Sequence, residues 1–127
     1  MPQTAKLFLI LGGLNAALVV LLGAFGAHAL KARLSAEMLA VYQTGVHYHL
    51  FHALGLLAVG LVAMQISDSA WLKWSGWLML VGIILFSGSL YTLSVSGVRG
   101  LGMVTPFGGV SFIVAWALFV VAIVKSA

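Results

Sequence analysis

Four apolar stretches constrain the fold of this chain more than any other feature. They cover residues 7–27, 46–66, 74–95 and 101–124, and none contains Asp, Glu, Lys or Arg. A helix that rises 1.5 Å per residue needs about 20 apolar residues to cross a bilayer. Only 6% of the 127 residues are charged, whereas about 25% are charged in an average soluble domain. We therefore predict an all-α, integral membrane four-helix bundle that forms one domain over residues 1–127.

The few charges say more about the surroundings of the chain than about its chemistry. Six Lys and Arg against two acidic residues give a net charge of +4, but the basic residues are scattered singly. Phosphate contacts with nucleic acid need a clustered positive surface, so we expect membrane lipids as partners and no nucleic acid. With four spans both termini lie on one side, and the basic residues divide equally between the two sides: Lys6, Lys73 and Lys125 against Lys31, Arg33 and Arg99. The positive-inside rule therefore predicts no orientation.

Two features mark the expected membrane interfaces. Trp71, Trp74 and Trp77 gather where the third helix should enter the bilayer, a position that Trp prefers. The longest connection joins the first two spans, where Ser35 can cap a helix and Glu37 falls in its first turn. We predict a short interfacial helical segment there, leading into the second span.

Small residues recur four positions apart within the spans. The pairs are Gly12 and Ala16, Gly13 and Ala17, Gly23 and Ala27, and Ser111 and Ala115. Such pairs let helix backbones approach closely in a membrane. We favour close packing within one bundle, with a homo-oligomer or a membrane-protein partner as the alternative.

Histidine is the residue that most suggests a site. His47, His49 and His52 lie close together and His28 follows the first span; polar residues at membrane depth are candidates for function. At 100° per residue His49 and His52 share a helix face, while His47 points elsewhere. A metal site would thus need His49, His52 and a third ligand such as His28 or Glu37. We favour structural hydrogen bonds over a metal, and predict no bound metal.

Other polar side chains add candidates. Tyr42 and Gly45 fall on one stripe with His49 and His52, and the gap at Gly45 could admit a lipid headgroup or a quinone, or could be a close helix contact. Ser87, Ser89 and Tyr91 in the third span could line a polar path or bond to neighbouring helices. For Asn15 in the first span we favour an interhelical hydrogen bond.

Catalytic constellations are lacking. Both acidic residues lie outside the spans, which disfavours paired carboxylates for acid–base chemistry. The sequence has no cysteine, no nucleophile elbow, no phosphate loop and no H-E-x-x-H motif. No cofactor is predicted, although a lipid or quinone would suit the stripe on the second span.

Four motifs in order resemble those of the YgdD-like inner-membrane proteins of bacteria, a domain family of unknown function (number 423) with small eukaryotic transmembrane relatives. They are Gly23–Leu30, Tyr48–Leu54, Phe86–Tyr91, and Thr105–Gly109 followed by Trp116. The resemblance implies four spans and a bacterial inner-membrane location, and it implies no activity. It also implies that His28 and His52 are family residues, whereas His49 stands where members often have Gln and His47 is atypical. The pair of His28 and His52 is therefore the leading candidate site.

Three hypotheses of function follow. The first is a non-enzymatic protein that binds a lipid, a quinone or a membrane partner around His28, Tyr48 and His52. The second is a small transporter or channel subunit that uses Ser87, Ser89, Tyr91 and Asn15. The third is a membrane metalloprotein or enzyme. We favour the first.

Overall fold

The chain forms four long antiparallel helices, seen in a computed structural model that describes all residues from 1 to 127. The first span joins α1 (Gln3–Phe25) to a π-helical turn, η1 (Gly26–Leu30), and the second is α2 (Ala36–Ala63). The third runs through α3 (Ala70–Gly82), a second π-helical turn, η2 (Ile83–Ser87), and α4 (Gly88–Ser96). The fourth joins a 3-10 turn, η3 (Arg99–Met103), to α5 (Thr105–Lys125). The predicted all-α fold with four membrane spans is confirmed.

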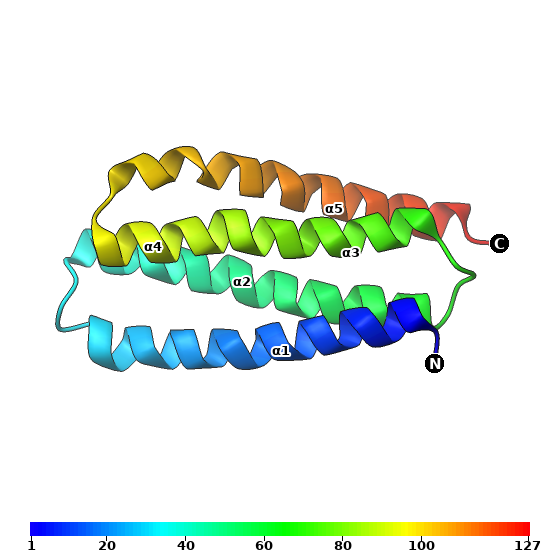
Figure 1. Ribbon diagram of the computed structural model, residues 1–127, viewed down its shortest axis with the longest axis horizontal. Helices are drawn as coiled ribbons and strands as arrows, with labels where there is room; N and C mark the ends of the chain where they lie inside the picture. Colours follow the sequence, from blue (N-terminus) through cyan, green and yellow to red (C-terminus); the bar gives the residue numbers. More distant parts are fainter.

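The helices run up and down, so both termini lie at the same end of the bundle (Figure 1). The spans are longer than predicted, each with 27 or 28 residues. The largest shift of a helix boundary is in α2, which begins at Ala36 instead of Val46 and ends at Ala63 instead of Ile66. The helical segment expected between the first two spans is thus the beginning of α2, and the structure has no separate helix there.

Local sequence signals explain where the helices begin and end. The Ser35 and Ser69 hydroxyls accept hydrogen bonds from the backbone N–H groups of Met38 and Leu72, which caps α2 and α3. Gly97 ends α4 with a φ of 76°, a left-handed conformation that suits glycine. Pro106 lies in the first turn of α5, where its missing N–H costs little.

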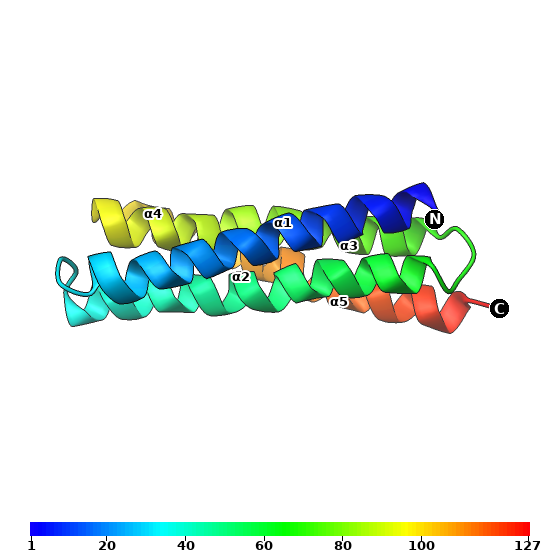
Figure 2. The same cartoon turned by 90° about the horizontal axis from the view of Figure 1, so that it is seen from below.

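The second and third spans form the centre of the bundle, with α1 and α5 on its outer sides (Figure 1). Figure 2 shows that α1 is tilted against α2, so that its start lies beside α3 and its end beside the start of α2. Two contacts agree with this tilt: the Phe8 ring packs edge-on against Trp77 of α3, and Gly26 packs against Tyr42 of α2. The core contains Phe8, Leu56, Val59, Met79 and Phe112, and all five side chains are buried.

Serine hydroxyls hold α3 and α5 together. The Ser75 hydroxyl donates to the carbonyl oxygen of Ala115, and the Ser111 hydroxyl donates to that of Leu78, each over 2.7 Å. The predicted small pair of Ser111 and Ala115 therefore lies in a close helix contact, as expected. Gly12 also packs closely against Leu57 of α2, whereas the adjacent Gly13 faces outward into open space.

Candidate functional site

A chain of hydrogen bonds crosses the bundle at His49. The Asn15 side-chain amide donates to the carbonyl oxygen of Leu11 in its own helix, which turns its oxygen toward His49. His49 therefore donates from Nε2 to Asn15 over 2.9 Å, and its Nδ1 accepts from the Tyr91 hydroxyl over 2.9 Å. The network links α1, α2 and α4 and includes the interhelical bond predicted for Asn15. Both ring nitrogens of His49 are used within the protein.

Tyr42 continues this polar layer toward the far end of the bundle. Its hydroxyl donates to the carbonyl oxygen of Leu22 over 2.5 Å, and its ring lies 5.2 Å from that of Tyr91. A side chain on Gly26 would collide with the Tyr42 ring, and a Cβ on Gly45 would lie 3.0 Å from the Tyr91 ring. The gap at Gly45 is therefore a close helix contact, which was one of its two interpretations.

His52 points away from His49 and forms a hydrogen bond to α5. Its Nδ1 donates to the backbone oxygen of Tyr48 over 2.8 Å, and its Nε2 accepts from the indole N–H of Trp116 over 3.0 Å. This assignment follows because an indole can only donate. The His52 ring also stacks on Phe112, with centroids 3.5 Å apart. His52 thus fixes the contact between α2 and α5.

The structure does not bring His49 and His52 together as the joint ligands that a metal site would need. A 60° separation suffices in a four-helix bundle to direct the two rings into different spaces, one toward α1 and α4 and the other toward α5. No group of three or more His, Asp or Glu side chains comes together in a way that could hold a metal ion.

His28 and His52, the leading pair, are not neighbours. His28 is exposed in η1 and has no hydrogen-bond partner within the protein. Gly26, two residues before His28, packs on Tyr42, which precedes His52 by ten residues, or about 15 Å of helix. The antiparallel course of the first two spans therefore places His28 near the end of the bundle and His52 near its middle.

The serines of the third span bond to neighbours. Ser87 donates to the carbonyl oxygen of Gly45 over 2.7 Å, across to α2. The Ser89 hydroxyl lies 2.8 Å from the Phe86 oxygen and 2.6 Å from the Thr105 hydroxyl of α5. Together with Tyr91, these hydroxyls connect helices, and no buried side-chain nitrogen or oxygen lacks a partner.

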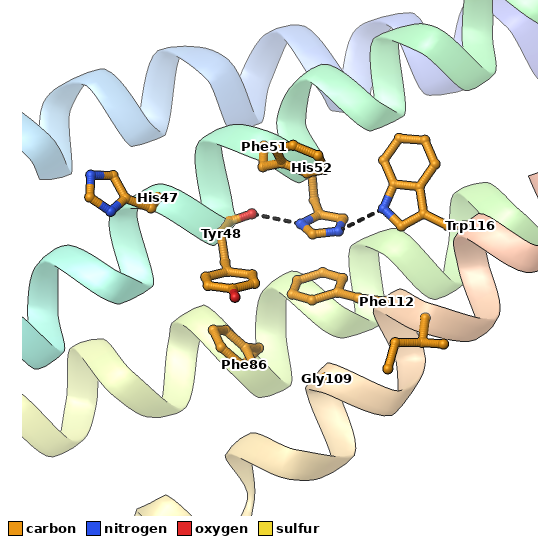
Figure 3. Close-up of a pocket in the computed structure, with 9 residues that line it drawn as sticks. His47, Tyr48, Phe51, His52, Phe86, Gly109, Phe112 and Trp116 are labelled. Atoms are coloured by element: carbon orange, nitrogen blue, oxygen red, sulfur yellow. Dashed lines mark hydrogen bonds between the residues drawn. The ribbon is translucent and has the colours of Figure 1, made fainter.

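The candidate site that remains is a groove on the outside of the bundle, between α2 and α5 (Figure 3). Its volume is about 560 Å³, within the usual range of small-molecule sites. Nine residues line it: His47, Tyr48, Phe51, His52, Phe86, Gly109, Phe112, Ile113 and Trp116. Phe51 and Ile113 are 61% and 72% exposed, so the groove opens sideways toward lipid.

Aromatic rings form most of the groove, and they support one another. The Tyr48 ring lies 4.5 Å from that of Phe86 and 6.4 Å from that of Phe112. Figure 3 shows the His52 ring held between the backbone oxygen of Tyr48 and Trp116, above the Phe112 ring. By contrast, the Tyr48 hydroxyl and the His47 imidazole make no hydrogen bond to the protein and are exposed. These two groups can bind a ligand.

Tyr48 and His52 were predicted as site residues, but most of the groove was not. Gly109, Phe112 and Trp116 lie three and four positions apart on one face of α5, a spacing that could have drawn attention to them. Their proximity to α2 depends on how the helices pack, which the periodicity of one segment does not contain.

Comparisons with known proteins agree with the membrane fold. The model of a family described as "Protein of unknown function (DUF423)" matches residues 22–109. The UPF0382 membrane protein YwdK of Bacillus subtilis is 52% identical over 120 residues, which cover 94% of this chain and 98% of that relative. The UPF0382 inner membrane protein YgdD of Escherichia coli K12 is 43% identical over 123 residues, 97% of this chain and 93% of the relative. No solved structure matches the chain.

Proposed function

The chain belongs to the DUF423 family of membrane proteins. For a protein surrounded by lipid in this way, we propose that the groove between α2 and α5 binds a quinone. It is a multi-pass protein of the bacterial inner membrane, with four candidate spans. The observation that carries the proposal is a lipid-facing groove whose walls are aromatic rings and whose two free polar groups are a phenol and an imidazole. The proposed role is binding without catalysis.

The aromatic wall of the groove supports a planar ligand. Rings of Tyr48, Phe86 and Phe112 lie within 6.4 Å of one another and pack together, and a flat ring can stack on the faces that this wall leaves open to the groove. The hydrogen bonds of His52 hold this arrangement before any ligand arrives, which lowers the entropy cost of binding.

The chemistry of the groove supports a ligand with a few oxygen acceptors. The Tyr48 hydroxyl can donate a hydrogen bond, and so can a ring nitrogen of His47. A quinone offers two carbonyl oxygens on a flat ring and an isoprenoid tail that is soluble in the bilayer. Since the groove opens beside Phe51 and Ile113, such a ligand can enter from the lipid without crossing water.

The interior of the bundle supports a surface site over a path through the protein. The polar groups that a path would need, Asn15, Ser87, Ser89 and Tyr91, are all engaged in hydrogen bonds between or within helices. The non-enzymatic binding hypothesis is therefore preferred to the transporter hypothesis.

Helix length supports an interfacial position for the start of α2. Its 28 residues span about 42 Å, whereas the hydrocarbon core is about 30 Å thick. The first turns, with Glu37, would therefore lie in the headgroup region. His47 and Tyr48, about three turns further on, would lie below it, at a depth suited to a quinone ring.

Tryptophan fluorescence can test the proposal, because Trp116 lines the groove. We would replace Trp71, Trp74 and Trp77 with Phe, reconstitute the protein in phosphatidylcholine vesicles and titrate with a ubiquinone bearing two isoprene units. Saturable quenching of Trp116 is expected. Tyr48→Phe should weaken binding about fivefold, the effect of one hydrogen bond of about 1 kcal/mol.

Two glycine variants separate binding from general quenching. A Cβ on Gly109 would lie 3.9 Å from the Phe86 ring, so Gly109→Leu projects a side chain into the groove and should abolish saturation. Gly13→Leu makes the same change on the outer face of α1 and should leave binding unchanged. Equal, non-saturable quenching in both variants would overturn the proposal. Saturable quenching by brominated phospholipid alone would identify an acyl-chain site in place of a quinone site.

A further inference from the structure

A second depression lies at the other side of the molecule, between α1 and α3 at the end where the termini lie. Its volume is about 470 Å³. Eight residues line it: Gln3, Thr4, Lys6, Leu7, Phe8, Ile10, Lys73 and Trp77. We propose that this depression binds one anionic phospholipid, with its phosphate between Lys6 and Lys73. The inference does not depend on the groove between α2 and α5.

The part of the depression nearest the end of the bundle is positively charged. Lys6 and Lys73 reach it from two different helices, and Lys6 has no carboxylate partner. Lys73 forms an ion pair of 3.1 Å with Asp68, but the Lys73 side chain is 44% exposed and that of Asp68 is 76% exposed, and ion pairs that solvent reaches are weak. A phosphate can therefore replace or share this contact at little cost.

The start of α1 adds backbone donors to the same region. No side chain caps this helix, so the N–H groups of its first turn, including those of Gln3 and Thr4, lack partners within the helix. Free N–H groups at a helix start attract anions. Together with the two lysines they give the depression a polar end suited to phosphate.

The part of the depression farther from the end of the bundle is apolar and continues toward the middle of the spans. Leu7 and Ile10 follow Lys6 along α1, and Trp77 follows Lys73 by one turn of α3. The floor is the buried Phe8 ring, which packs on Gly76 and meets the Trp77 ring edge-on at 5.5 Å. The indole N–H of Trp77 makes no hydrogen bond to the protein and can donate to an ester oxygen of the lipid.

This order of groups matches one phospholipid molecule. The free N–H groups and the lysines lie toward the end of the bundle, where a headgroup would sit. Trp77 lies one turn deeper than Lys73, where the glycerol esters would sit, and the apolar side chains would lie beside the acyl chains. Basic depressions between membrane helices bind anionic lipid headgroups in this manner. The charge selects an anionic lipid, because a zwitterionic headgroup would bring its own cation against the two lysines.

Native mass spectrometry tests the inference directly. The protein in mild detergent would be titrated with phosphatidylglycerol or with phosphatidylcholine of the same acyl chains. One phosphatidylglycerol should bind well before others, at concentrations where phosphatidylcholine does not. Lys6→Gln/Lys73→Gln should weaken this first binding about 25-fold, at about fivefold for each lysine.

A matched variant removes the same number of charges elsewhere. Lys31 and Arg33 are exposed at the opposite end and form no ion pair. Lys31→Gln/Arg33→Gln should therefore bind the first phosphatidylglycerol within twofold of the unchanged protein. The inference is overturned if both double variants weaken binding equally, since the attraction would then be diffuse. Equal binding of the two lipids by the unchanged protein would overturn it as well.

Discussion

Two imidazoles on α2, three residues apart, have opposite hydrogen-bonding roles. His49 donates from Nε2 and accepts at Nδ1, whereas His52 donates from Nδ1 and accepts at Nε2. In each case the neighbours decide the tautomer: the anchored amide of Asn15 for the first ring, and the indole of Trp116 for the second. A neutral imidazole suits both places because it supplies one donor and one acceptor in one rigid ring.

This pairing predicts which substitutions of His49 the bundle tolerates. His49→Leu leaves the Tyr91 hydroxyl and the Asn15 oxygen without their partner, and should lower the free energy of unfolding by about 1–3 kcal/mol. His49→Gln offers an amide oxygen to Tyr91 and an amide N–H to Asn15, and should cost less than about 1 kcal/mol. Unfolding by dodecyl sulfate in mixed micelles measures both. Equal losses in the two variants would mean that packing, and not hydrogen bonding, sets the role of His49.

At the level of elements, close backbone approach decides which faces of the helices meet. Gly12 lies against Leu57 of α2, and Gly108 of α5 lies against the backbone of Phe86. This second contact falls within the π-helical turn η2, which contains both Phe86 and Ser87. A π turn widens the helix by one residue and redirects the side chains that follow. Here Phe86 lines the groove while Ser87 bonds to α2.

Two adjacent glycines in α1 test the importance of this approach. A Cβ on Gly12 would lie 2.8 Å from the Leu57 side chain and 2.9 Å from its backbone nitrogen, so Gly12→Ala should destabilise the bundle by about 1–3 kcal/mol. A Cβ on Gly13 would have nothing within 4 Å, so Gly13→Ala should be neutral or stabilise by up to about 1 kcal/mol. The same unfolding measurement compares them. A loss in Gly13→Ala as large as that in Gly12→Ala would indicate that the outer face of α1 is covered, for example by a second copy.

The sequence predicted the elements well and their irregularities poorly. Apolar length alone located four spans, because the bilayer demands about 20 uncharged residues whatever the side chains are. The start of α2 at Ala36 was missed, because a search for apolar length stops at the polar residues before Val46. These residues suit the part of a helix that protrudes from the hydrocarbon. The two π turns have no signature in the composition, since Gly26 at the start of the first and Gly88 after the second keep ordinary helical φ and ψ angles that any residue can adopt.

For the whole molecule, polarity identified candidate residues but not their grouping. His49, His52, Ser87, Ser89 and Tyr91 were all singled out, and all of them form hydrogen bonds. Which residues meet depends on helix order and tilt, which one chain's periodicity does not encode. The groove therefore includes Phe112 and Trp116, while His28, the favoured partner of His52, lies toward another level of the bundle.

The membrane topology can be tested by labelling single introduced cysteines, because the chain has no cysteine of its own that would react. Single cysteines at Gln3, Ser67 and Ala127 lie at the end that holds both termini, and cysteines at Ala32 and Gly100 lie at the opposite end; all five positions are exposed. In intact spheroplasts a membrane-impermeant maleimide should label one of these sets and spare the other, whereas lysed cells should label both. If intact spheroplasts label positions from both sets, such as Gln3 together with Gly100, the four-span fold is contradicted.

The same experiment determines the orientation. Because three basic residues lie at each end, the positive-inside rule predicts no orientation. The set that is labelled would therefore establish on which side of the inner membrane the lysines of the proposed phospholipid site lie.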